Sequence, residues 1–319
     1  MITGMRVLVT GASGKVALPI ARALAAAGNE VYGLARFAEG GGTSTPGAQA
    51  ALAAVGITPI AGDVGRIDMA TLPDVDYVFH AGAALSTAFE VDPRWSFEVN
   101  AQATGRMMAR YRDIAGFVYC SSGSVYRYQG QRPLREDDPP GEHLGIYSWS
   151  KVAGENVVTF ASRQWGIPAT IIRIFSTYGP LGGAPAGRLA LILAGKAVPL
   201  HPQAPNNYNP IYEDDYVALG IRALEVAGTP PITVNWAGSE TVSAEDYCAY
   251  LAELAGRELR IDYTADAYYA LWPDVSYMHE VLGRTQVHWR DGMRRMVEAL
   301  HPELRAGASN SVGGSTVEG

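Results

Sequence analysis

Length, composition and charge exclude several classes of protein. The chain has 319 residues, 48% of them hydrophobic and 18% charged, which is enough for a large α/β domain plus a smaller lobe and is untypical of disorder. A net charge of −7 disfavours a nucleic-acid partner, and Cys120 and Cys248 alone provide neither a disulfide framework nor a CxxC metal motif. We therefore expect a cytoplasmic protein with no signal peptide, membrane span or metal site.

The first two-thirds of the chain alternate short apolar strands with helices. Residues 5–10 (MRVLVT) predict a buried strand that ends at a Gly-rich turn, and residues 15–27 predict an Ala- and Leu-rich helix. Further strands are predicted at 30–35, 77–80, 117–120 and 169–175, and further helices at 95–112, 147–165 and 215–227. Such alternation is typical of parallel βαβ units, so we predict a Rossmann doubly wound parallel sheet.

Proline and glycine become dense after Tyr178, which indicates a second, smaller unit. We expect residues 1–180 to form the NAD(P)-binding Rossmann domain, with 206–236 returning to it. A C-terminal α/β substrate lobe would then consist of 181–205 and 237–305. The small polar residues of 306–319 predict a disordered tail.

A glycine-rich turn, TGASGKVA at 10–17, lies between the first predicted strand and helix. Gly11 and Gly14 let the backbone approach a pyrophosphate, whose charge is received by free N–H groups at the helix N-terminus. This placement favours a dinucleotide site over a tight turn without a ligand. The predicted cofactor contacts from this turn are Gly11, Ala12, Ser13, Gly14, Lys15 and Val16.

The end of the second predicted strand bears on which dinucleotide binds. An acidic residue there would accept hydrogen bonds from a ribose 2′-hydroxyl, but this chain has Arg36. A guanidinium suits a 2′-phosphate, so the sequence favours NADP over NAD. The alternative is that Arg36 is a solvated surface residue.

Tyr147 and Lys151 form a YxxxK motif on a predicted helix. Residues four apart lie on one helix face, so the ammonium would favour the phenolate and lower the pKa of Tyr147 towards the range of acid–base catalysis. The alternative is an amphipathic helix that exposes its tyrosine.

Taken together, these motifs resemble the extended short-chain dehydrogenase/reductase family, over nearly the whole chain up to the tail. TGASGKVA is similar to that family's TGxxGxxG, with Ala17 in place of the third glycine. VYCSSGSVY at 118–126 resembles SSxxVYG, and RIFSTYGP at 173–180 resembles RxxNxYGP with Ser176 replacing the asparagine.

The resemblance implies further site residues. Ser122 would bind the substrate oxygen, Tyr147 would exchange its proton, and Lys151 would hold the nicotinamide ribose. Asn100 would be a cofactor or water contact, unless it is simply exposed on its helix. The remaining implied cofactor contacts are Asp63, Val64, His80, Ala81 and Gly82. We also expect a homodimer that acts on a small-molecule substrate.

The family contains several reactions. Sugar dehydratases carry an Asp-Glu pair where this chain has Gly123 and Ser124, which disfavours water elimination. Sugar epimerases carry two diphosphate-binding arginines where this chain has Tyr208 and His279.

Other cations, at Arg188, Lys196 or Arg284, could replace those two arginines. We favour an NAD(P)-dependent oxidoreductase, a carbonyl reductase or alcohol dehydrogenase with a non-nucleotide substrate. A nucleotide-sugar epimerase is the alternative, and an NAD(P)-sensing protein without catalysis is a third possibility.

Overall fold

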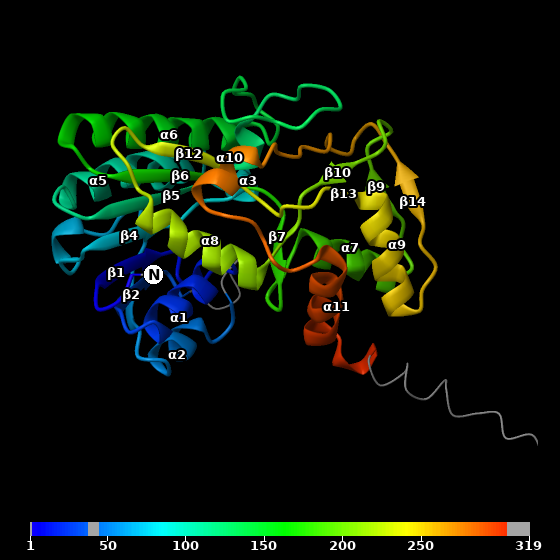
Figure 1. Ribbon diagram of the computed structural model, residues 1–319, viewed down its shortest axis with the longest axis horizontal. Helices are drawn as coiled ribbons and strands as arrows, with labels where there is room; N and C mark the ends of the chain where they lie inside the picture. Colours follow the sequence, from blue (N-terminus) through cyan, green and yellow to red (C-terminus); the bar gives the residue numbers. More distant parts are fainter. Residues whose placement is uncertain (1, 38–44, 305–319) are drawn as a thin grey trace, which may run out of the picture.

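A seven-stranded parallel sheet forms the centre of the larger of two units, on the left in Figure 1. The computed structural model describes residues 2–37 and 45–304, so the predicted tail at 306–319 lies outside the described residues. The strand order is β3-β2-β1-β4-β5-β6-β12, and every neighbouring pair is parallel, as predicted for a doubly wound sheet. The strands are β1 (Arg6–Thr10), β2 (Glu30–Ala35), β3 (Thr58–Ala61), β4 (Tyr77–His80), β5 (Gly116–Ser122), β6 (Ala169–Ile174) and β12 (Ile232–Trp236).

Burial on both faces explains why these strands are continuously apolar. In β1, Val7, Leu8 and Val9 are all fully buried, because their side chains alternate between two helical layers. One apolar core packs Val7 and Val9 against the first layer, and a second packs Leu8 against the other.

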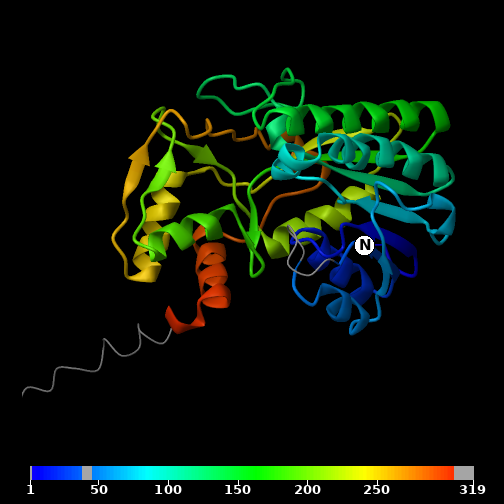
Figure 2. The ribbon, with the colours of Figure 1, turned by 180° about the vertical axis from the view of Figure 1, so that it is seen from behind.

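Helices cover the two faces of the sheet as separate layers (Figures 1 and 2). One layer contains α1 (Ala17–Ala26), α2 (Ala48–Ala53), α8 (Glu213–Glu225) and α10 (Ser276–Val281). The other contains α3 (Ser86–Val91), α4 (Pro93–Phe97), α5 (Ala103–Arg110) and α6 (Ile146–Trp165). Two short 3-10 turns lie at Met69–Thr71 and Gly123–Val125.

The helix predicted at 95–112 is interrupted. A π-helical turn, Glu98–Gln102, separates α4 from α5, which ends at Arg110. The side chain of Asn100 within this turn bonds both to the backbone of Ala84 and to Ser150 on α6. Accommodating these side-chain bonds accounts for the wider turn, which no apolar periodicity reveals.

A smaller lobe packs around its own apolar core, which includes Leu189, Tyr247, Leu251 and Met293. Its helices are α7 (Ala184–Leu193), α9 (Ala244–Ala255) and α11 (Trp289–Leu300). Its short strands are β7 (Thr177–Gly179), β8 (Gly182–Gly183), β9 (Val198–Leu200), β10 (Asn207–Tyr208), β11 (Ile211–Tyr212), β13 (Val242–Ser243) and β14 (Ile261–Tyr263). The chain enters this lobe three times: before α8, between β12 and α10, and after α10, which itself packs on the sheet.

The lobe is tied back to the sheet domain by a returning segment, residues 264–275, that runs beside the loop 126–140 (Figure 1). The amide of Leu134 donates to Trp272 O at 2.9 Å, and the amide of Asp274 donates to Leu134 O at 2.7 Å. Tyr128 stacks on Tyr269 with ring centroids 4.2 Å apart. These contacts join the two units beyond the covalent crossings.

Candidate active site

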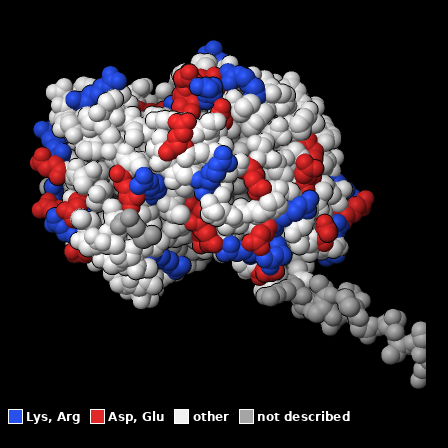
Figure 3. Space-filling view, in the orientation of Figure 1, with Lys and Arg blue, Asp and Glu red and all other residues white. Residues whose placement is uncertain are grey.

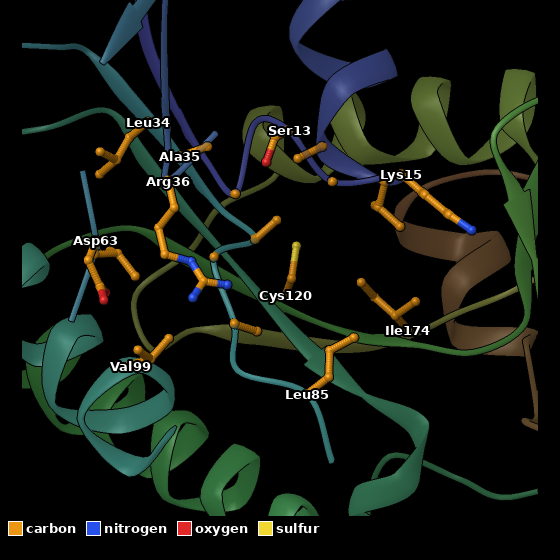
Figure 4. A pocket seen from close by; sticks show the side chains of 18 of the residues that line it. Ser13, Lys15, Leu34, Ala35, Arg36, Asp63, Leu85, Val99, Cys120 and Ile174 are labelled. Atoms are coloured by element: carbon orange, nitrogen blue, oxygen red, sulfur yellow. The ribbon is translucent and has the colours of Figure 1, made fainter. Parts of the chain in front are cut away.

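A cavity of about 310 Å³ lies at the carboxyl ends of β1, β2, β4 and β5, where ligands bind in doubly wound sheets (Figure 4). It is lined by most of the residues predicted from the sequence. These are Gly11, Ser13, Gly14, Lys15, Val16, Arg36, Asp63, Val64, Ala81, Gly82, Ser122, Tyr147 and Lys151.

The glycine-rich turn at one wall fits a pyrophosphate. Gly11 has φ +69°, and a Cβ on it would lie 2.9 Å from the Ala81 carbonyl, so only glycine fits this turn. No side chain caps the N-terminus of α1 among the described residues. The turn precedes this positive end of the helix dipole, so it suits a dinucleotide phosphate.

At one end of the cavity, Asp63 and Arg36 meet Trp95 (Figure 4 labels the first two). Asp63 Oδ1 accepts from the Gly65 amide, and Oδ2 accepts from Trp95 Nε1, both at 2.8 Å. The Arg36 guanidinium lies 5.0 Å from the Trp95 ring centroid. An acidic and a basic group are thus both available where the adenosine of a dinucleotide would lie.

Tyr147 and Lys151 come from the first turns of α6, and Ser122 from the end of β5. Burial raises the pKa of Tyr147 to about 12, while a hydrogen bond with Ser122 acts in the opposite direction. Burial also lowers the pKa of Lys151 to about 8, against the attraction of Cys120 and Glu155. Lys151 Nζ lies 4.4 Å from the Tyr119 ring centroid.

The raised pKa of Tyr147 differs from the sequence-based expectation. Spacing on the helix predicted that Lys151 would lower this pKa, but desolvation of the phenol is the largest influence on it. Burial therefore sets the direction of this pKa, and the spacing of the two residues on α6 does not.

A buried ion pair supports the end of the cavity that holds Ser122 and Tyr147. Arg173 on β6 donates to both carboxylate oxygens of Glu155, at 2.9 and 2.7 Å. Glu155 also accepts from Ser121 at 2.5 Å, and Arg173 donates to Tyr126 Oη at 2.8 Å. The segment that carries Ser122 is therefore held to α6 and to β6.

Three predicted residues do not line the cavity: Ala12, His80 and Asn100. Ala12 is fully buried, and its Cβ lies beside the position that a Cβ on Gly33 would occupy. Asn100 is buried in the π-helical turn, where its amide bonds to Ala84 and Ser150. This contradicts the reading of Asn100 as an exposed helix residue and makes it a support for the site.

His80 links three elements instead of facing the cavity. Its Nδ1 lies 2.7 Å from Thr10 Oγ1, and its Nε2 lies 3.1 Å from Thr104 Oγ1. Burial, followed by the charge of Lys151, lowers the pKa of His80 to about 3, so the ring is neutral. It braces β4 against β1 and α5.

Several lining residues were not found from the sequence. Leu85, Trp95, Cys120 and Ile174 carry no motif of their own, although Cys120 and Ile174 lie next to segments that do. Position at the carboxyl end of a predicted parallel strand is the signal that points to these two.

The substrate lobe supplies a cation at a position where the sequence had suggested a loss. Arg188 on α7 donates to Tyr208 Oη at 3.2 Å, and its guanidinium lies 4.8 Å from that ring centroid. It also lies 5.2 Å from the Tyr247 ring. His279 instead faces Ser239, at 2.9 Å.

The part of the chain that the structure describes offers neither a metal-binding cluster nor a membrane-spanning helix. No cluster of three His, Cys, Asp or Glu side chains is arranged to hold a metal ion. None of the helices described combines the length and apolar character needed to cross a bilayer. On the face seen in Figure 3, acidic and basic side chains are intermingled.

Comparison with known proteins agrees with the fold and the motifs. The profile of the NAD-dependent epimerase/dehydratase family matches residues 7–237. UDP-glucuronate 4-epimerase 2 of Arabidopsis thaliana is 27% identical to this chain over 70% of its residues. The match spans about half of that enzyme, 55% of its length. A dTDP-4-dehydro-6-deoxy-D-allose reductase of Streptomyces is 27% identical over 81% of this chain and 83% of its own length.

Among solved structures, UDP-glucuronic acid 4-epimerase from Bacillus cereus, in complex with UDP-glucuronic acid and NAD, superposes with a TM-score of 0.81. The alignment covers 94% of this chain and all of the other at 22% identity. At this level of identity the likeness concerns the fold.

Proposed function

Because the chain belongs to the NAD-dependent epimerase/dehydratase family, we propose that it is a nucleotide-sugar epimerase that inverts a carbinol carbon of the sugar. The sequence had favoured a carbonyl reductase with a non-nucleotide substrate. The named relatives act on nucleotide sugars, which supports the alternative reading instead. Those relatives are enzymes, and Tyr147, Lys151 and Ser122 all line one cavity, so a sensor without catalysis is not supported.

Arg188 is the observation that carries the substrate class. The absence of arginines at both Tyr208 and His279 disfavoured a nucleotide sugar, and the structure brings the Arg188 guanidinium to Tyr208. A guanidinium stacked on two aromatic rings keeps in-plane donors for a diphosphate. Arg188 on α7 thereby replaces the diphosphate-binding cation that position 208 lacks.

The proposed chemistry assigns one task to each of three side chains. Tyr147 takes the proton of the substrate hydroxyl and returns it, and Ser122 hydrogen-bonds the same oxygen. Lys151, with a pKa of about 8, carries most of its charge at neutral pH and would hold the nicotinamide ribose, the role that the family resemblance implies. When bound, the dinucleotide supplies reversible hydride acceptance at the sugar carbon.

The finer identity of the cofactor follows from Arg36. Its exposed guanidinium extends into the cavity from the end of β2, where an NAD-selective site would carry an acidic residue (Figure 4). We therefore retain NADP as the proposed cofactor. The expected homodimer and cytoplasmic location stay predictions.

The test is to incubate the purified protein with UDP-glucuronic acid or UDP-glucose and resolve the sugar epimers by NMR. We expect interconversion without net change in nicotinamide absorbance. Arg188→Leu should raise KM about tenfold to a hundredfold, the size of a charge-assisted contact, with little change in kcat. Arg257→Leu, at an exposed position of the same lobe, is the control.

Net reduction of a nucleotide sugar is the second candidate. The similarity to the Streptomyces reductase covers most of both chains and favours it. Consumption of nicotinamide in proportion to product, with a 4-keto nucleotide sugar as substrate, would replace the epimerase by this reading.

A further inference from the structure

Trp95 makes contacts that no motif predicts. Its backbone amide is capped by Asp92 at 2.9 Å, which fixes the first turn of α4 and directs the indole towards the cavity. From there the indole N–H donates to Asp63, and the ring lies under the Arg36 guanidinium. One side chain thus contacts both charged residues at this end of the cavity.

The contact with Asp63 orients a carboxylate without saturating it. Asp63 accepts one hydrogen bond on each carboxylate oxygen, from the Gly65 amide on Oδ1 and from the Trp95 indole on Oδ2. A carboxylate offers about four acceptor positions, so about two remain for a ligand amine. The turn is closely packed here, because a Cβ on Gly65 would lie 2.8 Å from Val99.

The contact with Arg36 orders a long cation that is otherwise exposed. A guanidinium stacked on an indole loses few of its donors, because they lie in its plane and point outward. It also loses less conformational entropy when a phosphate arrives, since the side chain is already placed.

We propose that Trp95 is a positioning residue for cofactor selectivity, acting through Arg36 on a 2′-phosphate and through Asp63 on the adenine. This rests on the proposed dinucleotide site. The two actions are separable, because phenylalanine keeps the aromatic face and loses the N–H, while leucine loses both.

Calorimetric titration of the purified, nucleotide-stripped protein with NADP+ and NAD+ tests this without catalysis. Trp95→Phe should weaken both dinucleotides by a similar factor and leave their affinity ratio within about twofold. Trp95→Leu should also lower the preference for NADP about threefold to tenfold, the size of a partly desolvated cation–π contact. In an Arg36→Leu background, Trp95→Leu should not change the ratio further.

A matched control lies elsewhere in the chain. Trp165 stacks under Arg112 at 4.5 Å and does not line the cavity, so Trp165→Leu should leave both affinities unchanged. The proposal for Trp95 alone is overturned if Trp95→Leu leaves the ratio of NADP+ to NAD+ affinity unchanged. It is also overturned if Trp95→Leu lowers this ratio further in the Arg36→Leu background. Wild-type protein that binds neither dinucleotide overturns the proposed function as well, and wild-type preference for NAD overturns the role of the 2′-phosphate.

Discussion

Replacing Lys151 by methionine should stabilise the fold while removing activity. Burial lowers the pKa of Lys151 from an ordinary value of 10.5 to about 8. At about 1.4 kcal/mol for each pKa unit, the charged side chain costs the folded state about 3 kcal/mol at neutral pH. Loss of the contact with Tyr119 offsets about 1–2 kcal/mol, so we expect a net gain of about 1–2 kcal/mol.

The stability gained by Lys151→Met should fall as the pH rises. Below pH 8 both the folded and the unfolded wild-type protein carry the proton, and the full cost is present. Between about 8 and 10.5 the unfolded chain binds more protons than the folded one, so wild-type stability rises with pH relative to the variant. The cost has vanished above about pH 10.5.

Urea unfolding, followed by circular dichroism on nucleotide-stripped protein at pH 7 and pH 10, measures this difference. Lys196→Met, at an exposed position, should change stability by no more than about 0.5 kcal/mol at either pH. The reasoning about the buried ammonium is wrong if Lys151→Met is less stable than wild type at pH 7. It is also wrong if the difference in unfolding free energy between the two proteins does not change with pH.

Four further variants test the site and its supports, and the last of them is a control. Tyr147→Phe should abolish turnover with dinucleotide affinity unchanged within about twofold, and substantial residual turnover would remove Tyr147 as the acid–base group. Glu155→Ala should cost about 3–5 kcal/mol in urea unfolding, because it leaves a buried guanidinium unpaired, and a loss below about 1 kcal/mol would contradict this. Gly154→Ala should destabilise the protein by about 1–3 kcal/mol, because the added Cβ would overlap the Tyr119 hydroxyl. Gly187→Ala places its Cβ in open space and should stabilise the protein by about 0.5–1 kcal/mol.

Much of the sheet could be predicted because its strands are buried on both faces. The predicted bounds 30–35 and 77–80 agree with β2 and β4. The edge strand Thr58–Ala61 was missed, since it is short, half-exposed and contains a proline. The break at Glu98–Gln102 was missed because it depends on side-chain bonds to distant residues.

The grouping of Ser122, Tyr147 and Lys151 in one cavity was predictable for a different reason. Tyr147 and Lys151 are four apart on one helix, and Ser122 lies in a motif that matches a family in order and spacing. What helical spacing could not give is the environment of Tyr147, since the direction of its pKa depends on burial by side chains from other elements. The approach of Arg188 to Tyr208 is likewise a tertiary contact.

The repeated passage of the chain between the sheet domain and the smaller lobe limits how this protein can recombine with its relatives. All residues that line the cavity lie between Gly11 and Ile174, so the lobe can change without altering them. A single crossover after Ile174 would nevertheless import a foreign α8 and β12, which pack on α1 and β6 of the original sheet. A functional chimera therefore requires three exchanged segments, roughly 175–212, 237–263 and 284–304, because α10 and the segment before it also pack on the sheet domain. Homologous swaps with one junction should yield mostly insoluble protein.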